Sequence, residues 1–272
     1  MFYLLAAVLI LLLFYLLALQ GRRPGFRMQD FQHCLFAHRG LYGGTVPENS
    51  LAAFRRAIAR NYGIELDLHL LQDGNVAVLH DSRLARMTGR PGILENLSTA
   101  DLQSCYLNGT KEAIPTLSQV LNLVDGRVPL ILELKTHDRN AARLTQTVCR
   151  MLDAYHGSYC LESFDPRCLL WLKKHRPQIL RGQLSENFLM KKDSDLSLLL
   201  RFGASYHLES FLTRPDFIAH KYEDRKTLSN FLIRRFWKIP AVTWTVHSQQ
   251  ELDTALQEGY VPIFEGFLPK DT

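Results

Sequence analysis

Residues 63–71 read GIELDLHLL, and polar and apolar side chains alternate along this stretch. An alternation with a period of two is typical of a β-strand that buries one face. Asp73 and Gly74 follow as a turn, and the apolar residues 76–79 then return as a second strand. The stretch therefore predicts a β-hairpin within a larger sheet.

Strand-like and helix-like segments alternate on both sides of this hairpin. Eight main strands are expected, at 34–37, 63–71, 130–134, 159–164, 179–184, 217–220, 241–246 and 260–264. Helices are expected between them, at 51–60, from 115 onward, at 166–175, within 193–212, at 228–238 and at 249–257. Eight such units in a chain of this length predict a closed (β/α)8 TIM barrel, for which about 250 residues are typical. A doubly wound open sheet is the alternative, but no Gly-x-Gly-x-x-Gly loop follows an expected strand.

The N-terminus has a different composition from the rest of the chain. Residues 2–19 are an unbroken run of 18 apolar residues, which as a helix would span about 27 Å of the roughly 30 Å hydrocarbon core of a bilayer. No basic residue precedes the run, whereas Arg22, Arg23 and Arg27 follow it. This order disfavours a cleaved signal peptide and, by the positive-inside rule, places the following domain in the cytoplasm. We expect a single-pass transmembrane anchor with a basic flank at 1–27 and one barrel domain at 28–272.

Composition and charge exclude several classes of protein. Apolar residues make up 47% of the chain and charged residues 22%, which excludes disorder. The formal net charge of +5 comes without a basic stripe interleaved with aromatic residues, so we expect no nucleic-acid partner. It fits an anionic membrane surface or a phosphorylated substrate better. Five irregularly spaced cysteines with no C-x-x-C argue against a disulfide framework and a zinc site.

Three acidic residues lie on expected strands. Glu65 and Asp67 are two positions apart on one strand, so their carboxylates point to the same face. Two solvent-facing acids would give the same pattern, but Glu133, between two leucines on another strand, favours a shared site. A group of like charges is costly unless a cation neutralises it. An oxygen-only set of this kind suits a hard divalent ion, Mg²⁺ or Ca²⁺.

Two histidines each end an expected strand beside a charged neighbour. A lone histidine is usually structural, but His38 and His80 would converge on the same acidic mouth, where imidazoles can exchange protons near neutral pH. Arg39 and Lys135 add two cations to the same rim. The combination predicts a site that binds a phosphate ester and cleaves it by acid–base chemistry.

A set of short motifs, in order along residues 34–247, resembles the glycerophosphodiester phosphodiesterase family. These motifs are AHRG at 37–40, PENS at 47–50, ELDL at 65–68, DG at 73–74, VLHD at 78–81, TG at 88–89, IPTL at 114–117, LELK at 132–135, SFD at 163–165 and WTV at 244–246. The resemblance implies a TIM barrel of the phospholipase-C-like phosphodiesterase type. It also implies a metal-dependent phosphoric diester hydrolase that releases an alcohol and sn-glycerol 3-phosphate.

The resemblance implies a role for each matching residue. His38 and His80 would be the acid–base pair, and Glu65, Asp67 and Glu133 would bind the metal. Arg39 and Lys135 would hold the phosphate. We further expect Trp244 to form a wall of the pocket and Glu48 to order a loop.

The chain departs from the family pattern at two places near the barrel mouth. His247 follows the WTV motif where the family usually has Asn, and residues 263–269 read IFEGFLP, so that Glu265-Gly266-Phe267 lies where a Thr-Asp-x-Pro pattern is usual. Both departures bear on which leaving group is accepted.

Two alternatives to the leading function remain. A phospholipase C or lysophospholipase D type of barrel would act on lipid head groups, with a lysophospholipid as substrate and the membrane reached through the N-terminal helix. A catalytically silent, membrane-tethered binding module is disfavoured because no expected histidine or carboxylate is missing. The expected helix within 193–212 has more apolar residues than one barrel-facing stripe needs, which fits either core packing or contact with a membrane.

Overall fold

A computed structural model describes residues 1–22, 28–191 and 197–270. Nine strands in these residues form one sheet in the order β1-β9-β8-β7-β6-β5-β4-β2-β3, and β1 also pairs with β2, which closes the barrel. The antiparallel β3 is the return arm of the hairpin, and the other eight strands are parallel, as the sequence predicts. The strands are β1 (Phe36–Ala37), β2 (Gly63–Leu70), β3 (Val76–Val78), β4 (Leu130–Leu134), β5 (Tyr159–Ser163), β6 (Arg181–Ser185), β7 (Phe217–Lys221), β8 (Ala241–Val246) and β9 (Val261–Phe264).

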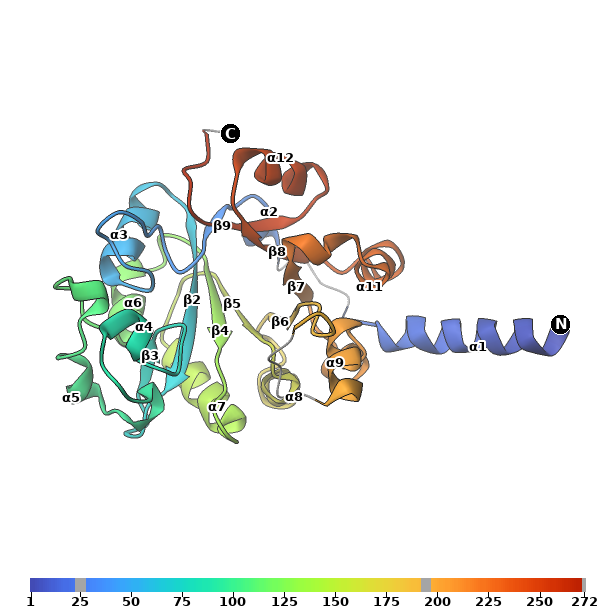
Figure 1. The fold of residues 1–272 in the computed structure, drawn as a ribbon, viewed down its shortest axis with the longest axis horizontal. Helices are drawn as coiled ribbons and strands as arrows, with labels where there is room; N and C mark the ends of the chain where they lie inside the picture. The colour runs from blue at the N-terminus through green and yellow to red at the C-terminus, as the bar shows by residue number, and fades with distance from the viewer. Residues whose placement is uncertain (23–27, 192–196, 271–272) are drawn as a thin grey trace.

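Helices surround the barrel (Figure 1). They are α1 (Phe2–Ala18), α2 (Gln29–Gln32), α3 (Leu51–Ala59), α4 (Ala85–Thr88), α5 (Thr99–Leu102), α6 (Leu117–Val124), α7 (Ala141–Leu152), α8 (Pro166–His175), α9 (Leu198–Ser205), α10 (Ser210–Thr213), α11 (Leu228–Leu232) and α12 (Gln249–Gln257), with shorter turns at η2 (Leu94–Asn96), η3 (Leu107–Gly109), η4 (Tyr222–Lys226) and η5 (Ile233–Trp237). Side-chain caps define several starts, such as Ser50, which accepts a hydrogen bond from the backbone N–H of Ala53 at the start of α3.

The prediction of one long helix within 193–212 is wrong. The first residues of that range lie outside the described part of the chain, and the remainder forms two short helices, α9 and α10. His207 interrupts them with a φ of 56°, a left-handed conformation that a continuing α-helix does not allow. The side chain of His207 is buried, and its Nε2 lies 3.1 Å from Asn230 Oδ1.

The amino-terminal end of the barrel is closed by apolar packing. Met28 and Phe31, from the segment containing α2, are buried against Phe36 and against strand residues such as Phe217. The rings of Phe31 and Phe36 stack with their centroids 5.8 Å apart. Because this end is plugged, polar side chains can gather only at the carboxyl ends of the strands, where barrel enzymes place their sites.

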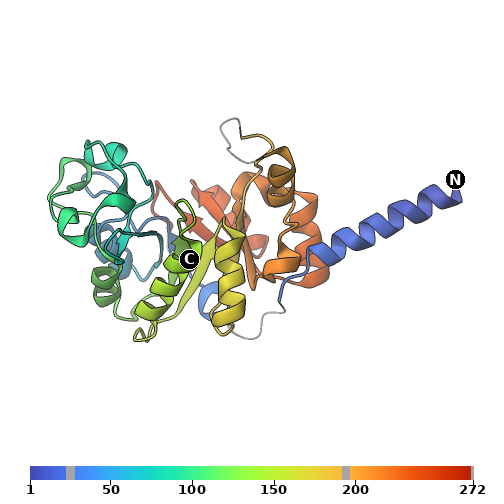
Figure 2. The same cartoon turned by 90° about the horizontal axis from the view of Figure 1, so that it is seen from below.

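The N-terminal helix α1 projects away from the barrel in both views (Figures 1 and 2). None of the helices in residues 1–22, 28–191 and 197–270 is long and apolar enough to cross a membrane, so the expected transmembrane span is not found. Helix α1 has 17 residues, and Leu19, the last residue of the expected span, is buried in the barrel core instead. Arg22 is likewise held by the barrel, with its Nε 2.5 Å from Asp216 Oδ1. The other two expected flanking cations, Arg23 and Arg27, lie outside the described residues.

Candidate active site

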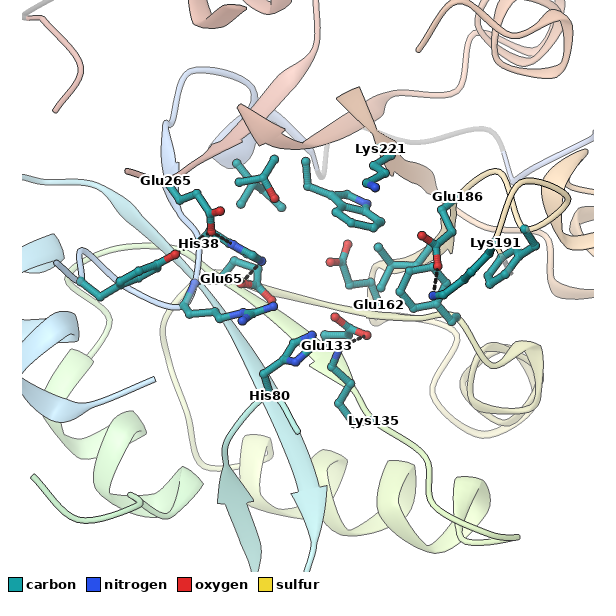
Figure 3. A pocket seen from close by; sticks show the side chains of 18 residues that line it. His38, Glu65, His80, Glu133, Lys135, Glu162, Glu186, Lys191, Lys221 and Glu265 are labelled. Carbon is teal, nitrogen blue, oxygen red and sulfur yellow. Dashed lines mark hydrogen bonds and ion pairs between the residues drawn. The ribbon is translucent and has the colours of Figure 1, made fainter. Parts of the chain in front are cut away.

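A cavity of about 540 Å³ opens at the carboxyl ends of the strands, within the range usual for small-molecule sites. Figure 3 shows the side chains that line it. The charged groups at its base come mainly from the first strands, and the later strands contribute most of the apolar groups, with Glu186, Lys191, Lys221 and Glu265 as further charged residues of the lining. The charged groups at the base include His38, Arg39, Glu65, His80, Glu133, Lys135 and Glu162, and the apolar groups include Phe164, Leu184, Phe188, Trp244 and Ile263.

The three acidic residues expected to bind a metal meet at the base of this cavity. Glu65 and Asp67 lie on β2, Asp67 is paired in register with Glu133 on β4, and one ligand oxygen from each lies within 4.8 Å of the others. All three are buried. Burial, with the neighbouring charges of Asp67 and Glu133, raises the pKa of Glu65 well above its usual range. Such a cluster binds either protons or a hard cation, and its all-oxygen composition fits a divalent ion.

Two cations are inserted among these acids. Lys135 Nζ lies 3.1 Å from Asp67 Oδ1 and 2.8 Å from Glu133 Oε1, and Arg39 Nε lies 3.5 Å from Asp67 Oδ2. Burial alone would raise the pKa of Asp67, but the charges of Lys135 and Arg39 and a hydrogen bond from Asn49 hold it well below its usual range. Asp67 therefore stays ionised, and Arg39 and Lys135 lie where a phosphate group could approach the acidic cluster.

A fourth carboxylate, Glu162, was missed by the sequence analysis. It lies on β5 in register with Glu133, lines the cavity and is 2% exposed. Its Oε2 has no hydrogen-bond partner among the described residues. Burial, with the charge of Glu133, raises its pKa well above the usual range. The signal was present, since Glu162 follows apolar Leu161 on an expected strand, much as Glu133 follows Leu132.

The charges of this interior do not cancel. The four carboxylates of Glu65, Asp67, Glu133 and Glu162 lie around two cations, Arg39 and Lys135, so full ionisation of these six groups would leave two more negative than positive charges. One divalent cation would balance them. The charge count and the unpartnered Glu162 oxygen both support a cation site here.

His38 is fixed by a residue from the last strand. Its Nδ1 lies 2.5 Å from Glu265 Oε2, just after β9, while its Nε2 lies 3.9 Å from Glu65 Oε2. The Tyr42 hydroxyl donates to the same Glu265 oxygen at 2.8 Å, and His247 Nδ1 lies 3.5 Å from Glu265 Oε1. The two departures from the family pattern, at 247 and 265, therefore contact each other, and Glu265 carries the contact to His38. Burial opposes ionisation of Glu265, but the hydrogen bond and charge of His38 lower its pKa to about 2.

His80 is fixed through a separate chain of contacts. Its Nδ1 lies 2.6 Å from Asp81 Oδ1, and Arg86 Nε donates to Asp81 Oδ2 at 2.5 Å. Arg86 also contacts Glu48, which in turn binds Arg39 at 2.9 Å, so Glu48 joins the loops as expected. Burial is the largest cause that lowers the pKa of His80, to about 4, against the opposing charge of Asp67. His80 is therefore neutral at pH 7.

The opposite wall of the cavity is apolar. Trp244 lines it, as expected, and its ring meets Phe164 edge-on with centroids 5.9 Å apart. Phe164 also meets Phe188 edge-on at 5.9 Å. Lys191 and Lys221 lie at the rim beside this wall, and Lys191 pairs with Glu186 (Figure 3). The cavity thus places a charged floor against an aromatic side.

Comparisons with known proteins agree with this geometry. The model of the glycerophosphoryl diester phosphodiesterase family matches residues 38–267. A glycerophosphodiester phosphodiesterase of Bacillus altitudinis is 26% identical over 244 residues, which cover 86% of this chain and 94% of the relative. A lysophospholipase D of Rattus norvegicus is 30% identical over 142 residues, which cover 47% of this chain and 44% of the relative. A phosphodiesterase of Oleispira antarctica, solved with the product sn-glycerol-3-phosphate, has the same fold, with a TM-score of 0.69 at 20% identity over 85% of this chain and 92% of that one.

Proposed function

Because the chain belongs to the glycerophosphoryl diester phosphodiesterase family and is a phosphoric diester hydrolase, we propose that it cleaves glycerophosphodiesters to an alcohol and sn-glycerol 3-phosphate with two histidines as acid and base. One observation carries this proposal. His38 and His80, far apart in the sequence, both line one cavity with the carboxylate cluster and with Arg39 and Lys135. An isolated structural role for either histidine would not require that arrangement.

The metal is part of the proposal. Glu65, Asp67 and Glu133 would hold a divalent cation, Mg²⁺ or Ca²⁺, with Glu162 available as a further oxygen ligand. When bound, the cation would draw charge from the phosphoryl oxygens. Arg39 and Lys135 would bind these oxygens as well, because both side chains stay charged among the acids.

The two histidines would have complementary roles. His80 is neutral at pH 7, so it can accept a proton from the attacking group. That group is water, or a neighbouring glycerol hydroxyl, in which case water must open the resulting cyclic phosphate to give sn-glycerol 3-phosphate. Glu265 accepts the hydrogen of His38 Nδ1, which directs Nε2 to the cavity beside Glu65. From that position His38 would protonate the departing alkoxide. Asp81 plays the corresponding orienting role for His80.

The second candidate substrate is a lysophospholipid, in which the diester carries an acyl chain. The aromatic wall of Phe164, Phe188 and Trp244 could contact an alkyl or acyl portion, as a lysophospholipase D would require. The rat relative of that name matches less than half of this chain. The water-soluble glycerophosphodiester therefore remains the leading substrate.

Helix α1 is the proposed membrane anchor, with the barrel on the cytoplasmic side. Its 17 residues are all apolar and none is fully buried, although Tyr15 and Leu16 at its end pack partly against the barrel. Protease treatment of intact spheroplasts tests the orientation. The barrel should resist digestion until the cells are lysed, and digestion from outside would contradict the cytoplasmic placement.

The product distinguishes this function from related reactions. We expect the full-length chain in detergent micelles, supplied with Mg²⁺ or Ca²⁺, to convert glycerophosphocholine to choline and sn-glycerol 3-phosphate, as followed by ³¹P NMR. Formation of phosphocholine and glycerol would mean that the other ester bond is cleaved. Turnover of a lysophospholipid but not of glycerophosphocholine would favour the second candidate.

A further inference from the structure

Exposed apolar side chains are concentrated in one part of the barrel. Beyond the C-terminal end of α1, 14 large apolar residues are exposed among the described residues, and 10 of them lie between residues 190 and 236. This range covers most of the connection from β6 to β7 and most of the connection from β7 to β8. The ten residues, here called the apolar face, are Met190, Leu198, Leu199, Leu200, Phe202, Phe211, Leu212, Leu228, Phe231 and Phe236.

The apolar face surrounds the point where α1 leaves the barrel. In Figure 1, α9 and α11 lie on either side of the root of α1, and Figure 2 shows α1 projecting from the same end of the molecule. The Tyr15 hydroxyl donates to the carbonyl of Tyr206 at 3.5 Å, and Trp237 Nε1 donates to the carbonyl of Leu16 at 2.8 Å. Helix α1 and the apolar face are therefore continuous.

These side chains are too exposed to be core residues. Leu198 and Leu199 in α9 are 72% and 80% exposed, and α9 buries no residue against the barrel. Phe231 in α11 and Phe236 in η5 are each 58% exposed. Ten exposed large apolar residues in two neighbouring connections exceed the scattered exposure that is normal for a soluble monomer, which marks an interaction surface.

The charges of the same connections select the kind of partner. Lys191, Lys221, Lys226, Arg235 and Lys238 are exposed there, against one exposed acid, Glu223, among residues 186–191 and 197–240. Two side chains with an apolar body and a polar tip, Tyr206 and Trp237, are half-buried at the root of α1. Apolar residues bordered by cations and amphipathic aromatics are typical of surfaces that bind anionic lipid.

We propose that the apolar face rests on an anionic lipid bilayer, so that the barrel lies with its β6–β8 side against the membrane into which α1 extends. This inference builds on the proposed anchoring role of α1. Phe188 and Lys191 line the active-site cavity and lie beside exposed Met190, so the cavity rim adjoins the apolar face. A diester held in the leaflet would then reach the charged floor laterally.

Lipid contact at single positions tests the placement with the full-length chain. An environment-sensitive NBD label is attached to cysteine in L200C on the apolar face, in L268C as a matched control and in L9C on α1. Leu200, Leu268 and Leu9 are 58%, 53% and 56% exposed, so exposure alone does not distinguish them. The unsubstituted chain is labelled in parallel for background, since Cys34 is half-buried and the other four cysteines are buried. The proteins are reconstituted in vesicles of phosphatidylcholine with phosphatidylglycerol, with and without lipids that carry a quenching doxyl group on the acyl chain.

We expect doxyl lipids to reduce the emission at position 200 at least twofold, and to leave position 268 within the error of the unquenched sample. Quenching at position 9 without quenching at 200 would overturn the placement of the apolar face while leaving the anchor intact. The absence of quenching at both 9 and 200 would overturn the anchor and the placement together. A label at 200 that is shielded in lipid-free detergent, in a dimer detected by light scattering, would assign the apolar face to a second copy instead. Quenching reports contact with lipid and not turnover, so none of these outcomes depends on whether the proposed reaction is correct. Each variant is also assayed on glycerophosphocholine, which tests the reaction separately.

Discussion

The β1–β4 side of the barrel and the β6–β8 side distribute their polar and apolar residues in opposite ways. The first buries its charges: Glu65 and Asp67 are 3% and 1% exposed. The second exposes its apolar residues: Leu199 is 80% exposed. On the first side the cations of Arg39 and Lys135 lie among the buried acids, whereas on the second side none of the described residues covers the exposed leucines. One barrel thus carries two surfaces, and different experiments should disable them separately.

Removal of a carboxylate from the β1–β4 side should have the largest effect. In E65Q the acidic cluster loses one charge and one carboxylate ligand oxygen, which should lower kcat/KM on the order of 10⁴-fold, a loss of about 5 kcal/mol of transition-state stabilisation. The measurement is the initial rate of sn-glycerol 3-phosphate release at saturating Mg²⁺ or Ca²⁺. The matched control is E223Q, which removes an exposed acid from the other side and should leave the rate unchanged. An E65Q rate close to that of the unsubstituted chain would contradict the proposed metal ligation.

Loss of either histidine should be nearly as severe. H38A and H80A should each lower kcat by roughly 10²–10⁴-fold, the usual range for positioned acid and base groups. If both serve one transition state, the double variant should lose less than the product of the single effects. Pre-steady-state and steady-state rates of the three variants provide the check. A near-normal kcat in one of them would remove that histidine from the reaction.

A smaller effect is expected where Glu265 orients His38. In E265Q the amide oxygen can still accept the hydrogen of Nδ1, but the carboxylate charge is lost, so kcat should fall by roughly tenfold with little change in KM. H247N changes a side chain that lies 3.5 Å from the other oxygen of Glu265, so its kcat should fall less. A rise in KM at constant kcat in E265Q would indicate a substrate-binding role for Glu265 rather than a positioning role.

Changes on the β6–β8 side should spare the reaction and affect only lipid-borne substrate. Each large apolar residue that leaves an apolar environment costs about 1.5–3 kcal/mol. The double variant L199E with F231E should therefore turn over a vesicle-embedded lysophospholipid at least about fivefold more slowly. Glycerophosphocholine turnover should stay within experimental error, and L268E is the control for an added surface charge. An equal loss on both substrates would mean that the substitutions disturb folding.

The buried histidines of the β6–β8 side should affect stability rather than catalysis. Burial lowers the pKa of His207 to about 4 and that of His220 to about 3. The unfolded chain, with histidine pKa values of about 6.5, then binds more protons than the folded chain as the pH falls below that value. Stability should therefore decrease on acidification from pH 6.5 towards pH 4, by about 2 kcal/mol for each histidine at pH 5. Thermal unfolding between pH 7 and pH 5 measures this, and H207Q should show a weaker pH dependence; an unchanged dependence would contradict the assignment.

Most of the β1–β4 side could be predicted because strand geometry places residues reliably. Side chains alternate between the two faces of a strand, so Glu65 and Asp67 share one face, and the parallel register of β2 and β4 places Glu133 beside Asp67. Glu162 follows from the same rule and could have been predicted. The link between Glu265 and His38 could not, because it joins residues 227 positions apart through the closure of the barrel between β1 and β9.

The β6–β8 side was predicted less well because helix ends and exposure depend on tertiary contacts. The expected helix within 193–212 is divided at His207, whose conformation is stabilised by a contact with Asn230 on a different connection. The same sequence window predicted an excess of apolar surface but not that α9 would bury none of it. Leu19 continues the apolar run of α1 in sequence, yet it packs into the barrel core.

Metal dependence of product release tests the central claim most directly. The full-length chain is stripped with EDTA, freed of chelator and titrated with Mg²⁺ and with Ca²⁺, while sn-glycerol 3-phosphate release from glycerophosphocholine is recorded. We predict that release stops in the stripped protein and returns in a saturable manner with at least one of the two ions. Undiminished release from the stripped protein would contradict a reaction that depends on a cation held by Glu65, Asp67 and Glu133.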